Sequence, residues 1–263
     1  MTNSNRQFAL VDLTTGQEYD ISEYSLRSKK QDEAYKRIQY YHQDNRHFSF
    51  ADMENIKNVI SKVKTVDCGY LLILQCYMEY GTGKLALDRK EMQKALGISK
   101  PTFQRFWAAM ISNGIIFKDN GEFYVNPDFH FRHQPNHNRV IKLFTTTLKQ
   151  LTDKLTASEL GFLYKLLPYV HYDTNMICAD PFTEPENIKF LNKTQIAILV
   201  DMDEKKASKL LDKLRKIGII VETIRQDDKR DHIFTLNPYV FYRKKGKPDD
   251  TLRGLFASTP YGQ

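Results

Sequence analysis

The sequence predicts an α+β fold, mainly α-helical with small β wings, on the basis of two observations. The stretch Leu85–Pro127 has the pattern of a helix, a tight turn, a second helix and a short hairpin, and a similar pattern recurs in residues 156–245. Each copy ends in an Asn-Pro pair followed by aromatic residues, at Asn126-Pro127 and Asn237-Pro238. A helix-turn-helix of this kind can place its second helix in a DNA major groove. We therefore predict two tandem winged helix-turn-helix domains.

Capping residues mark the helices of the first copy. Asp88 is a good N-cap for the first helix, and Gly97 is the residue type that commonly follows a helix end. Ser99 is a second candidate N-cap, and Pro101 falls in the first turn, where its missing N–H is tolerated. Apolar residues then recur at helical spacing and are expected to face a core: Phe103, Trp107, Met110 and Ile111.

A hairpin is predicted directly after the second helix. Ile115–Lys118 and Glu122–Val125 have the composition of strands, and Asp119-Asn120-Gly121 between them is a strong turn signal. Lys84–Leu87 is expected to add a short strand beside this hairpin. Val66–Tyr80 is the most apolar helical stretch of the chain, as expected for a first helix buried behind the other two.

The second copy repeats these signals. Thr156 and Glu159 form a capping box, and Asp203 can cap the later helix EKKASKLLDKLRKIG. The other elements expected here are a helix at Thr194–Val200, strands at Ile219–Arg225 and His232–Leu236, and an insertion at Tyr172–Lys189.

The region before the first copy has three expected elements. Phe8–Val11 and Gln17–Ile21 are predicted to be short strands around a turn, and Asp52–Val63 is predicted to be a packed helix. A basic segment rich in tyrosine lies between them. It could follow a phosphate backbone and stack on bases, or it could form a helix with packed tyrosines and solvated lysines. Its residues are Lys29, Lys30, Lys36, Arg37 and Arg46, interleaved with Tyr35, Tyr40 and Tyr41.

These elements divide the chain into five predicted parts. The stretch between the two copies is polar and carries Pro135, as linkers do. The parts are an N-terminal hairpin and helical extension (1–64), a first winged helix-turn-helix domain (65–132), a linker with a connecting helix at Val140–Leu155 (133–155), a second winged helix-turn-helix domain (156–245) and a C-terminal tail (246–263).

The composition favours a nucleic-acid partner. The formal net charge is +7 and the sequence pI is about 9.1, and such an excess of positive charge favours a polyanion. Many soluble proteins are mildly basic, so charge alone identifies no partner. No apolar run approaches the roughly 20 residues of a membrane span, and we expect a cytoplasmic protein without a membrane partner.

No metal or cofactor is predicted. None of the three cysteines belongs to a CxxC pair, and Cys68 and Cys76 lie in an apolar helical stretch where burial is expected. His130, His133 and His137 have spacings that would share one helix face and could hold a metal. A proline among them and the polar context argue against such a helix.

An enzyme is not predicted. The chain has no GxxxxGK[ST] phosphate-binding loop. It also lacks the His-hydrophobic-His pair that holds the metal of rolling-circle nickases, and without that site no tyrosine is a credible nucleophile. No cluster of paired carboxylates stands out.

The predicted DNA contacts lie on the outer faces of the second helix of each copy. Arg105 can pair with guanine and Gln104 with adenine through two hydrogen bonds each, whereas the lysines of the second copy suit phosphates as point charges. We therefore predict that the first copy reads sequence and the second holds the backbone, although any one lysine could instead belong to a solvated helix face. The predicted contacts are Lys100, Thr102, Gln104 and Arg105, then Lys205, Lys206, Ser208, Lys209 and Lys213, and at the second wing tip Lys229 and Arg230.

Three motifs resemble the RepL-type replication initiators of firmicute plasmids. They are ALVDLTTGQEYD near the N-terminus, ALGISKPTFQRF across the first helix-turn-helix, and FYVNPDFHFR at the end of its wing. The resemblance covers residues 8–132, and the second domain with its insertion at 172–189 departs from that short pattern. Two winged helices in one chain are also similar to iteron-binding plasmid initiators.

The resemblance implies a double-stranded DNA-binding protein that binds a plasmid or phage origin, with host replication or transcription proteins as further partners. A transcription regulator of phage or plasmid origin would grip DNA in the same way and is the first alternative. An adaptor that docks on a host polymerase or nuclease is the second, because helix-turn-helix units also serve as protein-binding modules.

Overall fold

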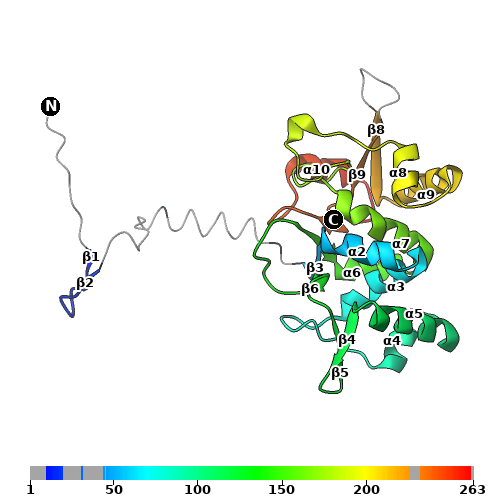
Figure 1. Ribbon diagram of the computed structural model, residues 1–263. Coiled ribbons are helices and arrows are strands. Elements are labelled where there is room, and N and C mark those ends of the chain that lie inside the picture. Colours follow the sequence, from blue (N-terminus) through cyan, green and yellow to red (C-terminus); the bar gives the residue numbers. More distant parts are fainter. Residues whose placement is uncertain (1–9, 20–30, 32–43, 45, 225–231, 262–263) are drawn as a thin grey trace. The chain divides into compact units, whose positions relative to one another are not determined.

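The computed structural model describes residues 10–19, 31, 44, 46–224 and 232–261 and has a mixed α/β composition (Figure 1). The chain divides into two units, Met1–Asp44 and Asn45–Gln263. Within the described residues, no helix is long and apolar enough to cross a bilayer.

The first unit contains the predicted hairpin. Strand β1 (Leu10–Val11) pairs with β2 (Glu18–Tyr19) in antiparallel fashion. Asp12 organises the turn, because its Oδ1 accepts from the N–H of Thr14 at 2.8 Å and of Thr15 at 3.2 Å. Most of the basic, tyrosine-rich segment lies outside the described residues, namely Lys29, Lys30, Lys36, Arg37, Tyr35, Tyr40 and Tyr41.

A four-stranded antiparallel sheet lies at the centre of the second unit. Its strand order is β10 (Phe241–Tyr242), β7 (Val140–Phe144), β3 (Phe48–Asp52) and β6 (His130–Phe131). The two central strands, β3 and β7, pair over their full length, from Phe48 opposite Phe144 to Asp52 opposite Val140. This sheet was not expected from the sequence.

The prediction of a connecting helix at Val140–Leu155 is wrong in its first third, because those residues form β7 and only then α6 (Thr145–Leu151). All five residues of β7 are buried. A strand buried on both faces shows no alternation and reads like a helix segment. Even Lys142 is buried, with Nζ donating to the Gly246 carbonyl at 2.9 Å.

The helix predicted at Asp52–Val63 begins later, since Asp52 ends β3 and α2 spans Asn55–Lys62. The apolar stretch Val66–Tyr80 forms α3 (Thr65–Leu74) and the 3₁₀ turn η2 (Gln75–Tyr77). Its counterpart is α7 (Ala157–Leu166), followed by η3 (Leu167–Tyr169).

Helices α3 and α7 pack against each other at two glycines. A Cβ on Gly69 would lie 1.8 Å from the carbonyl oxygen of Ala157, and a Cβ on Gly161 would lie 1.7 Å from that of Thr65. The contact is reciprocal, because Gly69 follows Thr65 by the same number of residues as Gly161 follows Ala157. Backbone therefore meets backbone at this crossing, and no larger residue fits.

Each of these helices leads into a helix–hairpin unit. The first helix–hairpin unit comprises α4 (Arg89–Ala95), α5 (Lys100–Ser112), β4 (Ile116–Asp119) and β5 (Glu122–Val125). The second comprises α8 (Lys193–Leu199), α9 (Glu204–Lys216), β8 (Ile220–Ile224) and β9 (His232–Leu236). The insertion contains η4 (Pro185–Asn187), and α10 (Asp250–Phe256) follows the second helix–hairpin unit.

Most predicted caps are confirmed, and two details differ. Asp88 caps α4 in a capping box, and so does Thr156 for α7. Ser99 precedes α5, but its hydroxyl lies 3.0 Å from Thr102 Oγ1 and bonds no backbone N–H. Ile111 is 41% exposed and does not face the core, where Phe106 lies instead.

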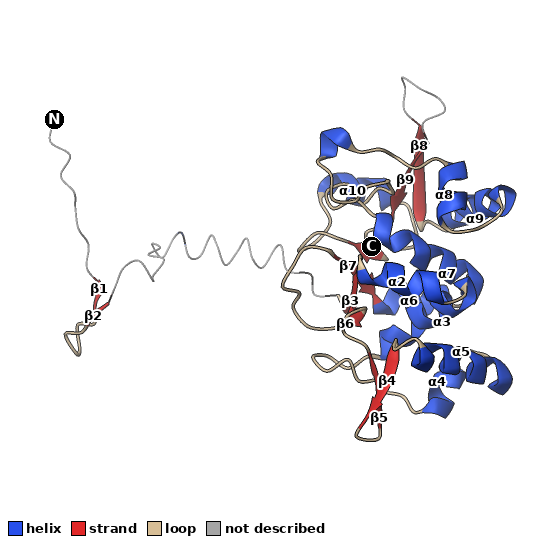
Figure 2. Cartoon of the chain, in the orientation of Figure 1, coloured by secondary structure: helices blue, strands red, loops and turns tan. Residues whose placement is uncertain are grey.

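The repeated Asn-Pro pairs make the same hydrogen bonds. Asn126 Nδ2 donates to the Gly114 carbonyl at 3.0 Å, and Asn237 Nδ2 donates to the Gly218 carbonyl at 2.7 Å. Both asparagines thus tie the end of the hairpin to the end of the preceding helix. Together with the sheet order and the helix crossing, this relates the two halves by an approximate twofold axis between β3 and β7 (Figure 2).

The crossing predicts a large effect of one methyl group. Gly161→Ala should destabilise the fold by about 1–3 kcal/mol, as overpacking of a tight contact does. Chemical denaturation measures the change. Gly254→Ala in α10 is the matched control, since nothing lies within 4 Å of its added Cβ, and helix propensity alone should make it neutral or stabilising. Equal stability of Gly161→Ala and wild type would contradict the crossing.

Candidate nucleic-acid interface

Helix α5 has a buried aromatic face and an exposed polar face. Phe103 stacks on Trp107 with ring centroids 5.5 Å apart, and Trp107 meets Phe123 of the hairpin edge-on at 4.8 Å. These contacts fix α5 against β5. The opposite face carries the predicted contacts: Lys100, Gln104 and Arg105 are exposed and Thr102 is half-buried.

The polar groups at the start of α5 lie close together. Arg105 Nη2 is 3.5 Å from Thr102 Oγ1, which is 3.0 Å from the Ser99 hydroxyl. The contact from Arg105 is at the limit of a hydrogen bond. The Arg105 charge also acts on Asp67 of α3, whose pKa is raised by burial and lowered by the charges of Lys64 and Arg105. An exposed guanidinium can bond a base edge through two N–H groups.

Helix α9 has an aliphatic buried face and a cationic exposed one. Ala207, Leu210, Leu211 and Leu214 are buried. Lys205, Lys206 and Lys209 are exposed and form no ion pair with any residue that the structure describes, and Ser208 is half-buried. Lys213 differs, because its Nζ lies 2.7 Å from both carboxylate oxygens of Glu159.

The described residues include the tip of the first hairpin but not the tip of the second. In the first, Asn120 and Gly121 both have positive φ, 46° and 86°, as a tight type I′ turn requires. In the second, Glu222 in the middle of β8 pairs with His232 of β9 at 2.8 Å and with Lys193 of α8 at 3.2 Å, which ties the hairpin to α8. The predicted contacts Lys229 and Arg230 lie outside the described residues.

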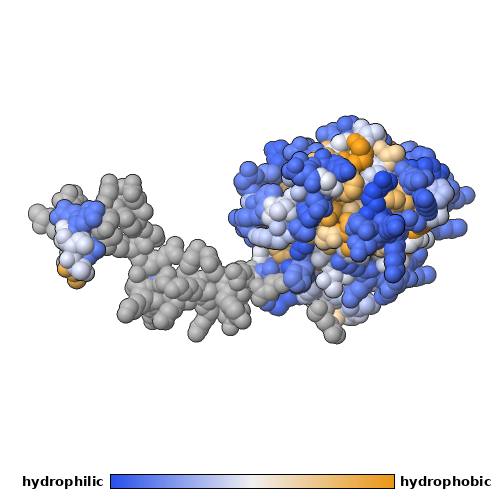
Figure 3. Space-filling view, turned by 90° about the horizontal axis from the view of Figure 1, so that it is seen from below, coloured by the Kyte–Doolittle hydropathy of each residue, from blue (hydrophilic) through white to orange (hydrophobic). Residues whose placement is uncertain are grey.

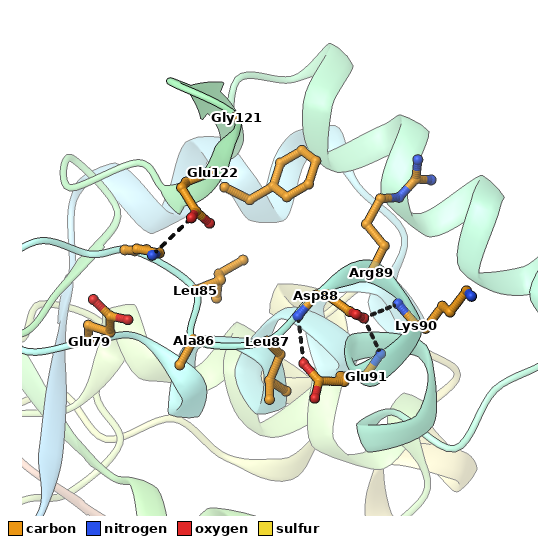
Figure 4. Close-up of a pocket in the computed structure, with 12 residues that line it drawn as sticks. Glu79, Leu85, Ala86, Leu87, Asp88, Arg89, Lys90, Glu91, Gly121 and Glu122 are labelled. Carbon is orange, nitrogen blue, oxygen red and sulfur yellow. Dashed lines mark hydrogen bonds and ion pairs between the residues drawn. The ribbon is translucent and has the colours of Figure 1, made fainter.

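A depression between the first hairpin and the start of α4 contains several charged residues, of which Arg89 and Lys90 were not predicted to have any role (Figure 4). Lys84 pairs with Glu122 at 3.1 Å, and the Asp88 carboxylate accepts from the backbone of α4. Arg89 lies 5.4 Å from the Trp107 ring centroid. Arg89 and Lys90 form a basic pair directly after the N-cap residue Asp88, and this pattern in the sequence could have identified them as candidates. The carboxylates around them make the depression unsuitable for a phosphate.

His130 lies in β6, and His133 and His137 lie in the linker; the three histidines have different partners and do not form a cluster. His130 is fully buried with Nε2 2.8 Å from the Tyr164 hydroxyl, and burial lowers its pKa to about 3. His133 stacks on Phe131, and His137 lies 3.4 Å from Asp52. Among the described residues, no group of three His, Cys, Asp or Glu side chains could hold a metal ion.

The cysteines are core residues. Cys68 and Cys76 are buried as expected, and burial raises the pKa of each thiol to about 12. Cys178 is buried as well, with its pKa raised to about 12 for the same reason. Thiols of such high pKa remain protonated at neutral pH and are poor nucleophiles and metal ligands.

Comparison with protein-family models, with curated proteins and with solved structures gave no match. The resemblance of residues 8–132 to plasmid initiators therefore stays a prediction, and the candidate interface is argued from its own side chains.

The buried His130 predicts a pH dependence of stability. An unfolded chain binds a proton at this residue near about pH 6.5, whereas the folded chain does so only near about pH 3. Stability should therefore fall as the pH decreases between these values, by about 2 kcal/mol from about pH 6.5 to about pH 5 through this group alone.

Denaturation of His130→Gln at both pH values should show a weaker pH dependence than wild type. His133→Gln is the control, because His133 is exposed and should leave the dependence in place. An unchanged pH dependence in His130→Gln would mean that this histidine is not buried neutral.

Proposed function

We propose that this chain is a sequence-specific double-stranded DNA-binding protein with two winged helix-turn-helix domains, a plasmid or phage replication initiator that binds an origin. The observation that carries the proposal is the pair α5 and α9. Each helix buries one apolar face beneath its own hairpin and exposes a polar or cationic face. Exposed cationic faces on paired helices suit the major grooves of a duplex.

In this proposal α5 reads bases. Arg105 supplies a planar fork of donors for guanine, and Gln104 supplies a donor and an acceptor for adenine. Lys100 and Thr102, in the first turn of α5, contact the flanking backbone or base edges. The aromatic contacts between α5 and β5 support this role, because a rigid helix keeps its side chains in register with base edges.

Helix α9 holds the phosphate backbone. Its exposed lysines, Lys205, Lys206 and Lys209, are compact charges on long stems, suited to phosphates and poorly suited to planar base edges. Ser208 adds a hydroxyl donor, and Lys229 and Arg230 of the second wing tip extend the contact to a neighbouring phosphate. The two domains therefore divide specificity and affinity between them.

The approximate twofold axis supports binding of both domains to one duplex. Figure 2 shows α5 and α9 toward opposite ends of the compact unit, with α3 and α7 between them. Helices related in this way approach a duplex in opposite orientations, as the two subunits of a dimer do on a palindromic operator. A single chain then covers two half-sites that are inverted in orientation and unequal in sequence.

A protein-binding adaptor is the second candidate, and one observation favours it. The first helix–hairpin unit exposes large apolar side chains: Tyr80 near its start is 76% exposed, and Ile111 and Phe117 are 41% exposed each. Figure 3 shows hydrophobic side chains among hydrophilic ones on the face seen from below. Such side chains could contact a host replication protein without excluding DNA binding elsewhere.

The first test of the proposal is the salt dependence of duplex binding by two variants. Wild-type affinity should fall steeply with salt, with a log–log slope that grows by about 0.9 for each phosphate neutralised. Arg105→Ala should cost about 1–3 kcal/mol on the preferred site and relax one base position. Lys209→Ala should weaken specific and random DNA alike and reduce the slope. A duplex affinity that does not change with salt concentration would contradict the proposal and favour the adaptor.

A footprint provides the second test. A bound monomer should protect two major grooves on one face of the duplex, about 10 base pairs apart. The half-site contacted by Lys100–Arg105 should tolerate fewer base changes than the other half-site. Protection of a single groove by the full chain would leave the second domain without a DNA role.

A further inference from the structure

Lys213 is bound to a carboxylate of the neighbouring helix. Its Nζ lies 2.7 Å from both Oε1 and Oε2 of Glu159, and the side chains are 41% and 21% exposed respectively. The other lysines of the α9 outer face, Lys205, Lys206 and Lys209, have no such partner among the described residues. Helical periodicity places Lys213 on the same face as these lysines, but in the folded chain Lys213 forms an ion pair that the other three lack.

Glu159 is itself held in place. Its carboxylate accepts from the Thr156 backbone N–H at 2.8 Å, and its own N–H donates to the Thr156 hydroxyl. Burial raises the pKa of this carboxyl, but hydrogen bonds from Lys213 and Thr156 outweigh burial and leave its pKa below the ordinary value. The N-terminus of α7 also favours an anion at this position. Lys213 is therefore tied to a fixed point on the helix that makes the glycine crossing.

Among the described residues of the first half, no ion pair occupies the equivalent position. The counterpart of Glu159 is Asp67, the third residue of α3, and the counterpart of Lys213 is Ala109, the tenth residue of α5. There α3 and α5 meet through Tyr70 and Phe106, whose rings lie edge to face at 5.5 Å. The counterparts of Tyr70 and Phe106 in the second half are Phe162 and Leu210, so the Glu159–Lys213 pair is added beside a contact that is apolar in both halves.

Moving Lys213 to a phosphate would be unfavourable. The lysine would have to leave two short, charge-assisted hydrogen bonds, and Glu159 would then face the polyanion without its counter-charge. From these contacts, and resting on the proposed function for its DNA readout, we infer that Lys213 is a positioning residue that fixes α9 to α7 through Glu159.

The salt slope of duplex binding separates a positioning residue from a phosphate contact. Lys213→Met should leave the log–log slope unchanged, whereas the matched control Lys209→Met should lower its magnitude by about 0.9. Equal losses of slope in the two variants would overturn the inference and make Lys213 a DNA contact.

A double-mutant cycle tests the ion pair without DNA. Glu159→Gln, which keeps an acceptor for the Thr156 N–H, and Lys213→Met should each lower the urea midpoint of the full chain, and the double variant should lose clearly less than the sum of the two. Additive losses in the double variant would overturn the inference. If wild type bound no duplex at all, the proposed function would fail, while this arm would still decide whether Glu159 holds Lys213.

Discussion

The close crossing of α3 and α7 is the constraint on which the rest of the compact unit depends. Only glycine fits at positions 69 and 161, because the backbone of the opposite helix occupies the space of a Cβ at each. Each crossing helix precedes its own helix–hairpin unit, α3 the first and α7, after the insertion, the second, so the crossing helps to set where α5 and α9 lie relative to each other. The antiparallel pairing of β3 with β7 obeys the same approximate twofold symmetry in the sheet. The spacing of α5 and α9, the two candidate DNA-contacting helices, therefore depends on packed backbone and not only on the length of a linker.

The second half contains an insertion that the first half lacks, and the framework shared by the two halves is the same in both. Its insertion is anchored by Arg243, which is 4% exposed and donates to the carbonyls of Val170 at 2.9 Å, Pro181 at 2.8 Å and Asn138 at 3.0 Å. Burial lowers the pKa of this guanidinium to about 10, so it stays charged at neutral pH. A buried cation needs such acceptors, and they join the insertion to β10 and to the loop between the halves.

Local signals in the sequence predicted the local structure, and distant contacts escaped them. Capping residues such as Asp88 and turn residues such as Asn120 act on neighbours within a few positions, so their roles follow from composition alone. Strand β7 was missed because a strand buried on both faces has no alternation, and its partner β3 lies far away in sequence. In the candidate interface, the outward direction of Lys209 follows from helical periodicity. The ion pair of Lys213 does not, because Glu159 lies 54 positions away.

The halves differ at several buried positions. At three of them the first half has glycine or an apolar side chain and the second has a polar side chain with a partner inside the chain, while the reverse exchange also occurs, since the hydrogen-bonded pair Ser49–Gln75 corresponds to Ile141 and Leu167. Asn175, at φ 57°, replaces Gly83 and donates through Nδ2 to the carbonyls of Leu236 and Phe241. The other exchanges are Lys165 for Ile73, with Nζ donating to the Val200 carbonyl at 2.8 Å, and Lys213 for Ala109, with Glu159 as its partner. Such contacts engage lysine side chains within the fold, so those lysines are not available to an external partner. The positive charge that the second half can offer to a polyanion is therefore smaller than its lysine content suggests. On α9, the exposed lysines without an ion pair among the described residues are Lys205, Lys206 and Lys209 in the first two turns and Lys216 in the last turn.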